Sequence, residues 1–155
     1  GDFDLVAQDG STRHPRASVS SPFIHTMKVR FRDTDAQGHV YFGNYFEFCD
    51  EALSAYMRAL GMPWQELLKR GTDLFYASAT CDYLGSARFE DLVHVEAQIV
   101  KIGTTSITSE FTVRGDDGQT LAKARLVSVC VDSSTRQKTR VPDEFRDALA
   151  AFEGV

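Results

Sequence analysis

The sequence of 155 residues lacks any hydrophobic run that approaches the roughly 20 residues of a membrane-spanning helix. Its N-terminus also lacks an apolar core preceded by positive charge, which a secretory signal would show. Basic residues are outnumbered, with 17 Lys and Arg against 22 Asp and Glu and a net charge of -5. A duplex-binding surface needs clustered cations that replace phosphate counterions. We therefore expect a cytoplasmic protein that binds neither a membrane nor nucleic acid.

Cysteine is also scarce. Cys49, Cys81 and Cys130 are odd in number, lie in apolar surroundings and form no Cys-x-x-Cys pair. This pattern favours neither a disulfide framework nor a zinc site. We expect reduced, buried thiols and no metal site.

The composition is sufficient for one compact domain. Hydrophobic residues make up 43% of the chain and aromatic residues 11%, enough for a sizeable core at this length. Residues 1–22 are rich in Ser, Gly and Pro and show no sustained periodicity. We expect a flexible arm over 1–22 and a folded domain over 23–155.

Hydrophobic periodicity predicts an α+β fold. A loosely alternating strand, 23–31, precedes a long helix that ends at Gly61, and a short helix follows over 63–70. The later segments predict four antiparallel strands and a terminal helix, over 74–84, 91–102, 106–114, 120–131 and 143–152. The long helix is apolar on much of its circumference, so we expect a sheet wrapped around it. Such a small sheet leaves edges that a second copy would cover, which predicts at least a dimer.

The segment Asp33-Thr34-Asp35 is the most informative motif. It places two carboxylates between a predicted strand and the start of the buried helix. Free N–H groups and the macrodipole at a helix start stabilise negative charge and can hold an oxyanion. Thioester hydrolysis needs a group that attacks the carbonyl or activates water, and donors directed at the developing oxyanion.

One known family carries a similar run, which reads here Arg32-Asp33-Thr34-Asp35-Ala36-Gln37-Gly38-His39-Val40-Tyr41-Phe42-Gly43-Asn44-Tyr45. The chain thus resembles the 4-hydroxybenzoyl-CoA thioesterase-like hot-dog enzymes, from Phe23 to about Phe145. The resemblance implies an antiparallel sheet wrapped around a long central helix. It also implies acyl-CoA or aryl-CoA hydrolysis at the interface of a homodimer or homotetramer, with coenzyme A as part of the substrate and no cofactor.

The resemblance also assigns roles to residues. The second Asp of the motif, Asp35, would be the nucleophile or the general base, and the backbone N–H of Phe42 would polarise the thioester carbonyl. Ser86, in a stretch that approaches the site from the partner subunit in the family, would bind the acyl group or water. The other substrate-binding candidates are Tyr41, Asn44, Tyr45, Arg88, Lys138 and Arg140.

Two departures from the family pattern bear on this assignment. Some branches use a catalytic His where this chain has Phe42, so that version of the mechanism is in doubt. Other branches grip the coenzyme A nucleotide with basic residues at the turn that here reads Gly103-Thr104-Thr105. The phosphates would then need other cations, namely Lys101, Arg88 or the cluster Arg136, Lys138 and Arg140.

Several of these residues also have plainer interpretations. Asp33 is expected to cap the loop or pair with Arg32. His39 is a candidate general base, but a histidine in a loop more often forms a hydrogen bond to a backbone group. Aromatic residues beside a buried helix, such as Tyr41 and Tyr45, are commonly core, and Asn44 is a natural N-cap.

Three rival functions stay open. Asp33, Asp35, Gln37 and Gly38 fall where a calcium-binding EF-hand loop places its first ligands, although Asn44 replaces its final Glu. A non-catalytic hot-dog module that binds acyl-CoA would keep the pocket without a carboxylate at the thioester. A dehydratase would need a pocket His with an acid on the central helix, which this chain does not supply convincingly.

Overall fold

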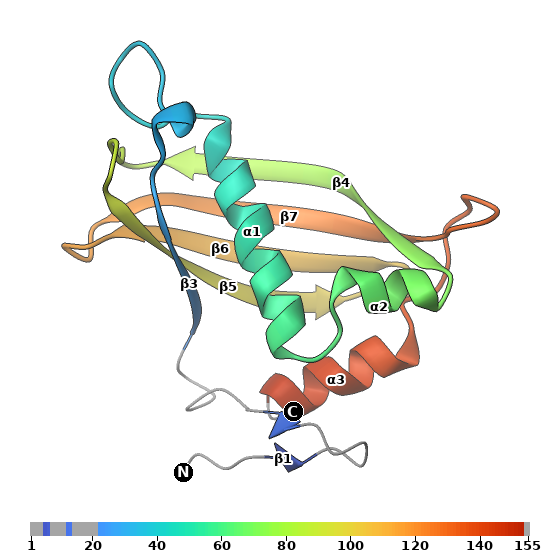
Figure 1. Ribbon diagram of the computed structural model, residues 1–155. Coiled ribbons are helices and arrows are strands. Elements are labelled where there is room, and N and C mark those ends of the chain that lie inside the picture. Colours follow the sequence, from blue (N-terminus) through green and yellow to red (C-terminus); the bar gives the residue numbers. More distant parts are fainter. Residues whose placement is uncertain (1–4, 7–11, 14–21, 154–155) are drawn as a thin grey trace.

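The computed structural model describes residues 5–6, 12–13 and 22–153 (Figure 1). The predicted flexible arm over 1–22 lies mostly outside the described residues, and the domain boundary after it stays a prediction. Within that stretch the two short strands β1 (Leu5–Val6) and β2 (Thr12–Arg13) pair antiparallel.

A five-stranded antiparallel sheet forms the body of the protein. Its strands are β3 (Phe23–Lys28), β4 (Thr72–Tyr83), β5 (Leu92–Ile102), β6 (Ser106–Gly115) and β7 (Thr120–Asp132), in the spatial order β3-β5-β6-β7-β4. Only β5, β6 and β7 follow one another as neighbours, so the predicted succession of four strands is wrong for β4. The chain crosses the sheet after β4, which leaves β4 and β3 as its two edges (Figure 1).

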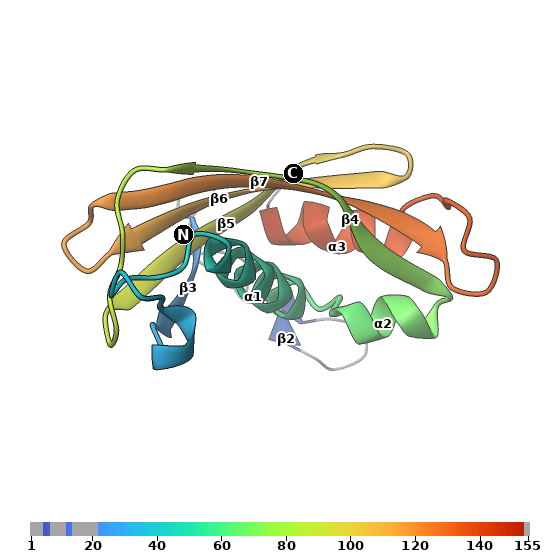
Figure 2. The same cartoon turned by 90° about the horizontal axis from the view of Figure 1, so that it is seen from above.

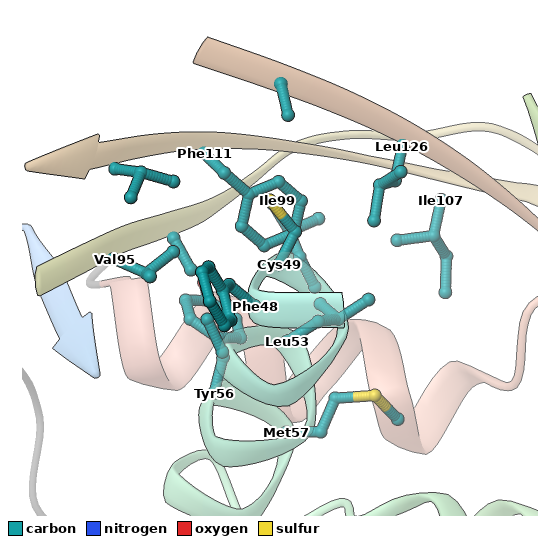
Figure 3. Packing of buried hydrophobic residues seen from close by; sticks show 14 of the residues in the cluster. Phe48, Cys49, Leu53, Tyr56, Met57, Val95, Ile99, Ile107, Phe111 and Leu126 are labelled. Atoms are coloured by element: carbon teal, nitrogen blue, oxygen red, sulfur yellow. The ribbon is translucent and has the colours of Figure 1, made fainter. Parts of the chain in front are cut away.

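The long helix α1 (Asn44–Ala59) packs against one face of this sheet together with the terminal helix α3 (Asp143–Glu153) (Figure 2). Its buried side chains meet those of the sheet strands, as Phe48, Cys49 and Leu53 do with Val95, Ile99, Ile107, Phe111 and Leu126 (Figure 3). The ring of Tyr56 joins α1 to α3, with its centroid 5.2 Å from that of Phe152. An antiparallel sheet around one buried helix is the predicted α+β architecture, which is confirmed.

Glycines and a proline set the predicted breaks. Pro63 caps the short helix α2 (Trp64–Lys69), and Gly71 follows it with a φ of 83°. Gly118 has a φ of 82° in the turn between β6 and β7, as the Asp117-Gly118 pair predicts. L-residues with a Cβ rarely adopt these angles, so both turns depend on glycine.

Strand β4 is unusually open for its length. Six consecutive residues, 75–80, are exposed, and Phe75 and Tyr76 keep 41% and 48% of their surface. The strand contains no Lys, Arg or Pro, the residues that commonly protect a sheet edge. It therefore offers free backbone hydrogen-bonding groups beside exposed aromatic rings.

Among the described residues, no helix is both long and apolar enough to cross a membrane. The cytoplasmic location inferred from the sequence stays a prediction.

Candidate active site

The first carboxylate of the motif, Asp33, holds the loop together. It ends a short 3-10 helix, Phe31–Asp33, and its side chain is 8% exposed. Its Oδ2 accepts the N–H of Arg30 at 2.8 Å, and its carbonyl accepts both the N–H of Tyr41 and the side-chain amide of Asn44, each at 2.9 Å. All of these bonds are made within the loop and the adjoining helix start. Asp33 therefore stabilises the loop, which is the structural role expected from the sequence.

The second carboxylate, Asp35, is half-buried at the start of a tight turn. Its N–H donates to the carbonyl of His39 at 3.0 Å, and its Oδ1 accepts the N–H of Gln37 at 2.9 Å. Gly38, with a φ of 84°, closes the turn. Oδ2 of Asp35 accepts no hydrogen bond from the described residues, so one carboxylate oxygen is left for a substrate or a water.

The turn carries the chain back to the start of α1. Thr34 pairs with Val40 in an antiparallel bridge, and the N–H of Tyr41 bonds back to Asp33, so Asp35 and Phe42 belong to one closed loop. Among the described residues, the N–H of Phe42 donates no hydrogen bond. The loop thus contains an unused backbone donor as well as the carboxylate, and the catalytic roles that the resemblance gives them stay predictions.

Asn44 does not cap the helix, and that sequence interpretation is wrong. Gly43 occupies the N-cap position, and Asn44 is already the first helical residue. Its side-chain amide turns back to the carbonyl of Asp33 instead. Asn44 thus ties the helix start to the loop that carries Asp35.

Aromatic rings surround the helix start. Phe42 is 60% exposed, and its ring centroid lies 4.7 Å from that of Tyr41 and 6.1 Å from that of Tyr83. Tyr45 is different, because it is buried and its hydroxyl accepts the N–H of Ala87 at 3.2 Å. Burial raises the pKa of Tyr45. Tyr41 thus lies on the open surface of the site and Tyr45 beneath it.

The stretch that contains Ser86 and Arg88 packs against the loop of its own chain. Val40 donates its N–H to the carbonyl of Ala87 at 2.9 Å, and His39 forms a bridge with Arg88. Both Ser86 and Arg88 are exposed. Arg88 is therefore the nearest predicted cation to the Asp35 turn within one chain, while Ser86 lines a separate cleft of about 610 Å³.

The other predicted cations, Lys138 and Arg140, belong to the segment between β7 and α3. In both views this segment lies at the opposite end of the sheet from the loop that precedes α1 (Figures 1 and 2). Arg140 pairs with Asp143 at 3.3 Å. Their neighbour Arg136 contacts Asp73 at 3.8 Å and stacks 4.7 Å above the ring of Phe75 at the start of β4. A single chain does not bring these cations to Asp35.

Three clefts of the described chain lie away from the carboxylate of Asp35. A cleft of about 310 Å³ lies between α1, α2 and β4, a second of about 430 Å³ covers the outer face of the sheet, and the third contains Ser86. None of the three is lined by Asp35. The Asp35 loop therefore lies outside these three clefts.

The loop does not have the architecture of an EF-hand. A strand and a 3-10 turn precede it in place of a helix. Across the described part of the chain, no group of three or more His, Cys, Asp and Glu side chains is arranged to hold a metal ion. One Asp35 oxygen is bonded to the N–H of Gln37, and Asp33 is bonded to the backbone.

Sequence reasoning missed one contact of the site. The hydroxyl of Tyr83 donates to the carbonyl of Phe42 at 2.8 Å and so joins the end of β4 to the start of α1. The two residues are 41 positions apart. No local pattern signals this bond, which depends on the placement of β4 at the sheet edge nearest the helix start.

Comparison with known proteins gives a consistent result. Residues 29–149 match the thioesterase-like superfamily. A 1,4-dihydroxy-2-naphthoyl-CoA hydrolase of Nostoc punctiforme is 34% identical over 79% of this chain and 83% of its own, and an acyl-CoA thioesterase of Haemophilus influenzae, YbgC, is 30% identical over 84% and 96%. The crystal structure of a hypothetical protein from Aquifex aeolicus superposes with a TM-score of 0.77 at 27% identity, covering 83% of this chain and 99% of that one.

Proposed function

The chain belongs to the thioesterase-like superfamily and is a thioester hydrolase with the hot-dog fold, and from this premise we propose that it cleaves acyl- or aryl-coenzyme A with Asp35 as the reacting carboxylate. The observation that carries the proposal is the free oxygen of Asp35 in one closed loop with the unused N–H of Phe42. The resemblance to 4-hydroxybenzoyl-CoA thioesterases and the similarity to a naphthoyl-CoA hydrolase both favour an aromatic acyl group. No cofactor beyond the coenzyme A of the substrate enters this scheme.

Two routes fit the geometry. As general base, Asp35 takes a proton from water while the water oxygen bonds to the thioester carbon. As nucleophile, a carboxylate oxygen bonds to that carbon and forms an anhydride, which water then cleaves. In both routes the carbon–sulfur bond breaks, its electron pair leaves with sulfur, and the thiolate takes up a proton, so that the products are the free acid and coenzyme A.

The N–H of Phe42 would act on the other side of the same carbon. Negative charge develops on the carbonyl oxygen when the tetrahedral intermediate forms, and a fixed donor stabilises that charge without reorganisation. The positive end of the α1 dipole adds to this effect within the first turn of the helix. Because the donor belongs to the backbone, the Phe42 side chain does not need to be a histidine.

A second copy of the chain would complete the site. Strand β4 has a free edge without Lys, Arg or Pro, and Asp35 lines none of the three clefts described above. Antiparallel pairing of two β4 strands about a two-fold axis would cover the exposed aromatic rings and continue the sheet. We propose this homodimer, alone or within a homotetramer, as the active form.

The same pairing would supply cations for coenzyme A. Strand β4 has 12 residues, and its first residue Thr72 and last residue Tyr83 are thus separated by roughly 36 Å. A two-fold axis near its middle brings the Thr72 end of one copy beside the Tyr83 end of the other. The cluster of Arg136, Lys138 and Arg140 from one copy would then lie beside the Asp35 loop of the other, where Arg88 adds a fourth cation for the phosphates.

A non-catalytic acyl-CoA-binding module is the second candidate, because binding alone needs the pocket and the cations but not Asp35. The two candidates differ in turnover. Purified protein is incubated with a panel of coenzyme A thioesters that includes benzoyl, hydroxybenzoyl, naphthoyl and aliphatic acyl groups, with detection of free thiol. We expect multiple turnovers of at least one thioester, while binding without thiol release would establish the module instead.

A further inference from the structure

The two peptide groups just before α1, Tyr41–Phe42 and Phe42–Gly43, have the same orientation. The carbonyl of Tyr41 accepts the N–H of Asn44 at 2.9 Å, and the carbonyl of Phe42 accepts the N–H of Tyr45 at 3.4 Å. Both carbonyls therefore point along the helix. In a trans peptide the N–H points opposite to its carbonyl, so the N–H groups of Phe42 and Gly43 point out beyond the helix start.

Neither of these N–H groups has an internal partner among the described residues. Of the two, the peptide that joins Phe42 to Gly43 is held more firmly, because its carbonyl also accepts the hydroxyl of Tyr83 at 2.8 Å. A hydrogen bond to a carbonyl polarises the whole peptide group and strengthens its N–H as a donor. That N–H belongs to Gly43.

The Tyr83 hydroxyl, which polarises this peptide, is positioned by the contacts of its ring and stays protonated. Tyr83 is the last residue of β4, and its ring packs edge-on against both Phe42 and Tyr45, at centroid distances of 6.1 and 5.6 Å. Burial, followed by the neighbouring Cys81 thiol, raises the pKa of Tyr83 to about 12. The hydroxyl thus remains a donor through the neutral and moderately alkaline range.

The Tyr41 ring leaves no room for a side chain at position 43. A Cβ on this residue would lie 2.9 Å from Cε2 of the Tyr41 ring, closer than real contacts allow. Its φ of -67° and ψ of -23° are ordinary helical values, so backbone strain does not demand a glycine here. The missing side chain leaves room for the Tyr41 ring beside Gly43.

We propose that the N–H of Gly43 is a second oxyanion donor beside that of Phe42, and that Tyr83 is the positioning residue that holds and polarises the peptide between Phe42 and Gly43, to which the Gly43 N–H belongs. This inference rests on the proposed thioesterase function. Tyr83 touches neither the substrate nor the reacting atoms in this scheme, because it acts through the Phe42 carbonyl. The second donor lowers the barrier to the tetrahedral intermediate and contributes little to substrate binding.

Tyr83→Phe tests the positioning role, since it removes only the hydroxyl. We expect kcat to fall about 10-fold with KM changed less than about twofold, a fraction of the loss that follows complete removal of a donor. Tyr76→Phe is the matched control on the same strand, because it removes a hydroxyl bonded to Asp50 at 2.5 Å. The control is expected to keep its kcat, and an equal fall in both variants would overturn the proposal.

Gly43→Pro and Gly43→Ala form a second test, because both add a Cβ but only proline removes the N–H. The φ of Gly43 suits proline. We expect kcat of the proline variant to lie about 100-fold below that of the alanine variant. Tyr83→Phe should cost much less in the Gly43→Pro background than in the wild type, because the donor that it positions is already gone.

The two proposals fail in different ways. If the wild type releases no thiol from any thioester, the proposed function fails. If the wild type turns over but Gly43→Pro matches Gly43→Ala in kcat, or if Tyr83→Phe costs the same in both backgrounds, only the second donor fails. Unfolding temperatures of all five variants, the double variant included, identify any loss that follows from misfolding.

Discussion

At the scale of single residues, the two carboxylates of the motif have separate tasks although one residue lies between them. Asp33 is buried, its Oδ2 accepts the N–H of Arg30, and its backbone carbonyl accepts two further bonds, whereas Asp35 is half-buried and its side chain accepts, among the described residues, only the N–H of Gln37 at Oδ1. The difference follows from burial, because a buried carboxylate must be hydrogen-bonded while a half-buried one can be satisfied by water. Asp33 and Asn44 thus build the frame in which Asp35 is presented.

Asn44→Ala removes the amide that holds the Asp33 carbonyl. We expect the free energy of unfolding to fall by about 1 kcal/mol, the usual contribution of one hydrogen bond, and kcat to fall because the loop is less ordered. Urea denaturation and thiol-release assays measure the two effects. Gln65→Ala, which truncates an exposed amide on α2, is the control and should stay within about 0.5 kcal/mol of the wild type.

At the scale of elements, β4 matters most, because it connects the site to the exposed edge. Its end supplies Tyr83 to the helix start, and its beginning contacts the cation Arg136 through Asp73 and Phe75. A negative charge near its middle should therefore break the proposed dimer. We expect Ala79→Asp to shift the protein toward monomers in sedimentation velocity and to reduce activity in parallel.

The control for that variant is Ala151→Asp, which introduces the same charge at an exposed position of α3. It should leave both the assembly and the activity unchanged. A dimer that survives Ala79→Asp with full activity would show that β4 is not the interface.

The turn after β7 carries a separate pH dependence. Hydrogen bonds from the N–H groups of Thr135 and Ser134 lower the pKa of Asp132. Because the folded-state pKa lies below the unfolded value of about 3.9, its contribution to stability is present above about pH 4 and is lost as the pH falls through the folded-state pKa. We expect wild type to unfold at a higher temperature than Asp132→Asn at neutral pH, with the difference shrinking as the pH falls below about 4. A difference that stays constant over this range would contradict the assignment.

Most elements could be predicted from the sequence, since their signals are local. The stripe of α1, the glycines after α2 and between β6 and β7, and the strand segments all occur within a few residues of their predicted bounds. The place of β4 could not be predicted, because alternation along a strand says nothing about which strand lies beside it. The amide of Asn44 was misjudged for the same reason, as its partner lies 11 residues away across a turn.

At the scale of the whole molecule, a single chain does not bring all of the predicted site residues together. The motif predicts Asp35 and the donor of Phe42 in the loop before α1, but the segment after β7 that contains Lys138 and Arg140 lies at the other end of the sheet (Figure 1). No property of a single sequence shows which distant cations a second copy would bring. The two-fold pairing of β4 is the arrangement that would unite both halves.

Mixed dimers test this arrangement. One variant carries Asp35→Asn, and the other carries Lys138→Ala with Arg140→Ala, which we expect to raise KM for coenzyme A thioesters. In a mixed dimer one of the two sites combines the intact Asp35 of one chain with the intact cations of the other. After random exchange we expect about a quarter of all sites to regain wild-type KM and kcat. If mixing restores no activity, carboxylate and cations do not come from different chains.

The measurement that tests the central claim most directly is kcat of Asp35→Asn on the thioester that the wild type hydrolyses fastest. The substitution keeps the shape of the side chain and removes its charge, and Asp147→Asn, on the exposed face of α3, removes the same charge elsewhere. We expect Asp35→Asn to lose at least about 100-fold in kcat, the scale of a deleted general base, while Asp147→Asn retains wild-type turnover. Wild-type turnover by a correctly folded Asp35→Asn would contradict the assignment of Asp35 as the reacting carboxylate.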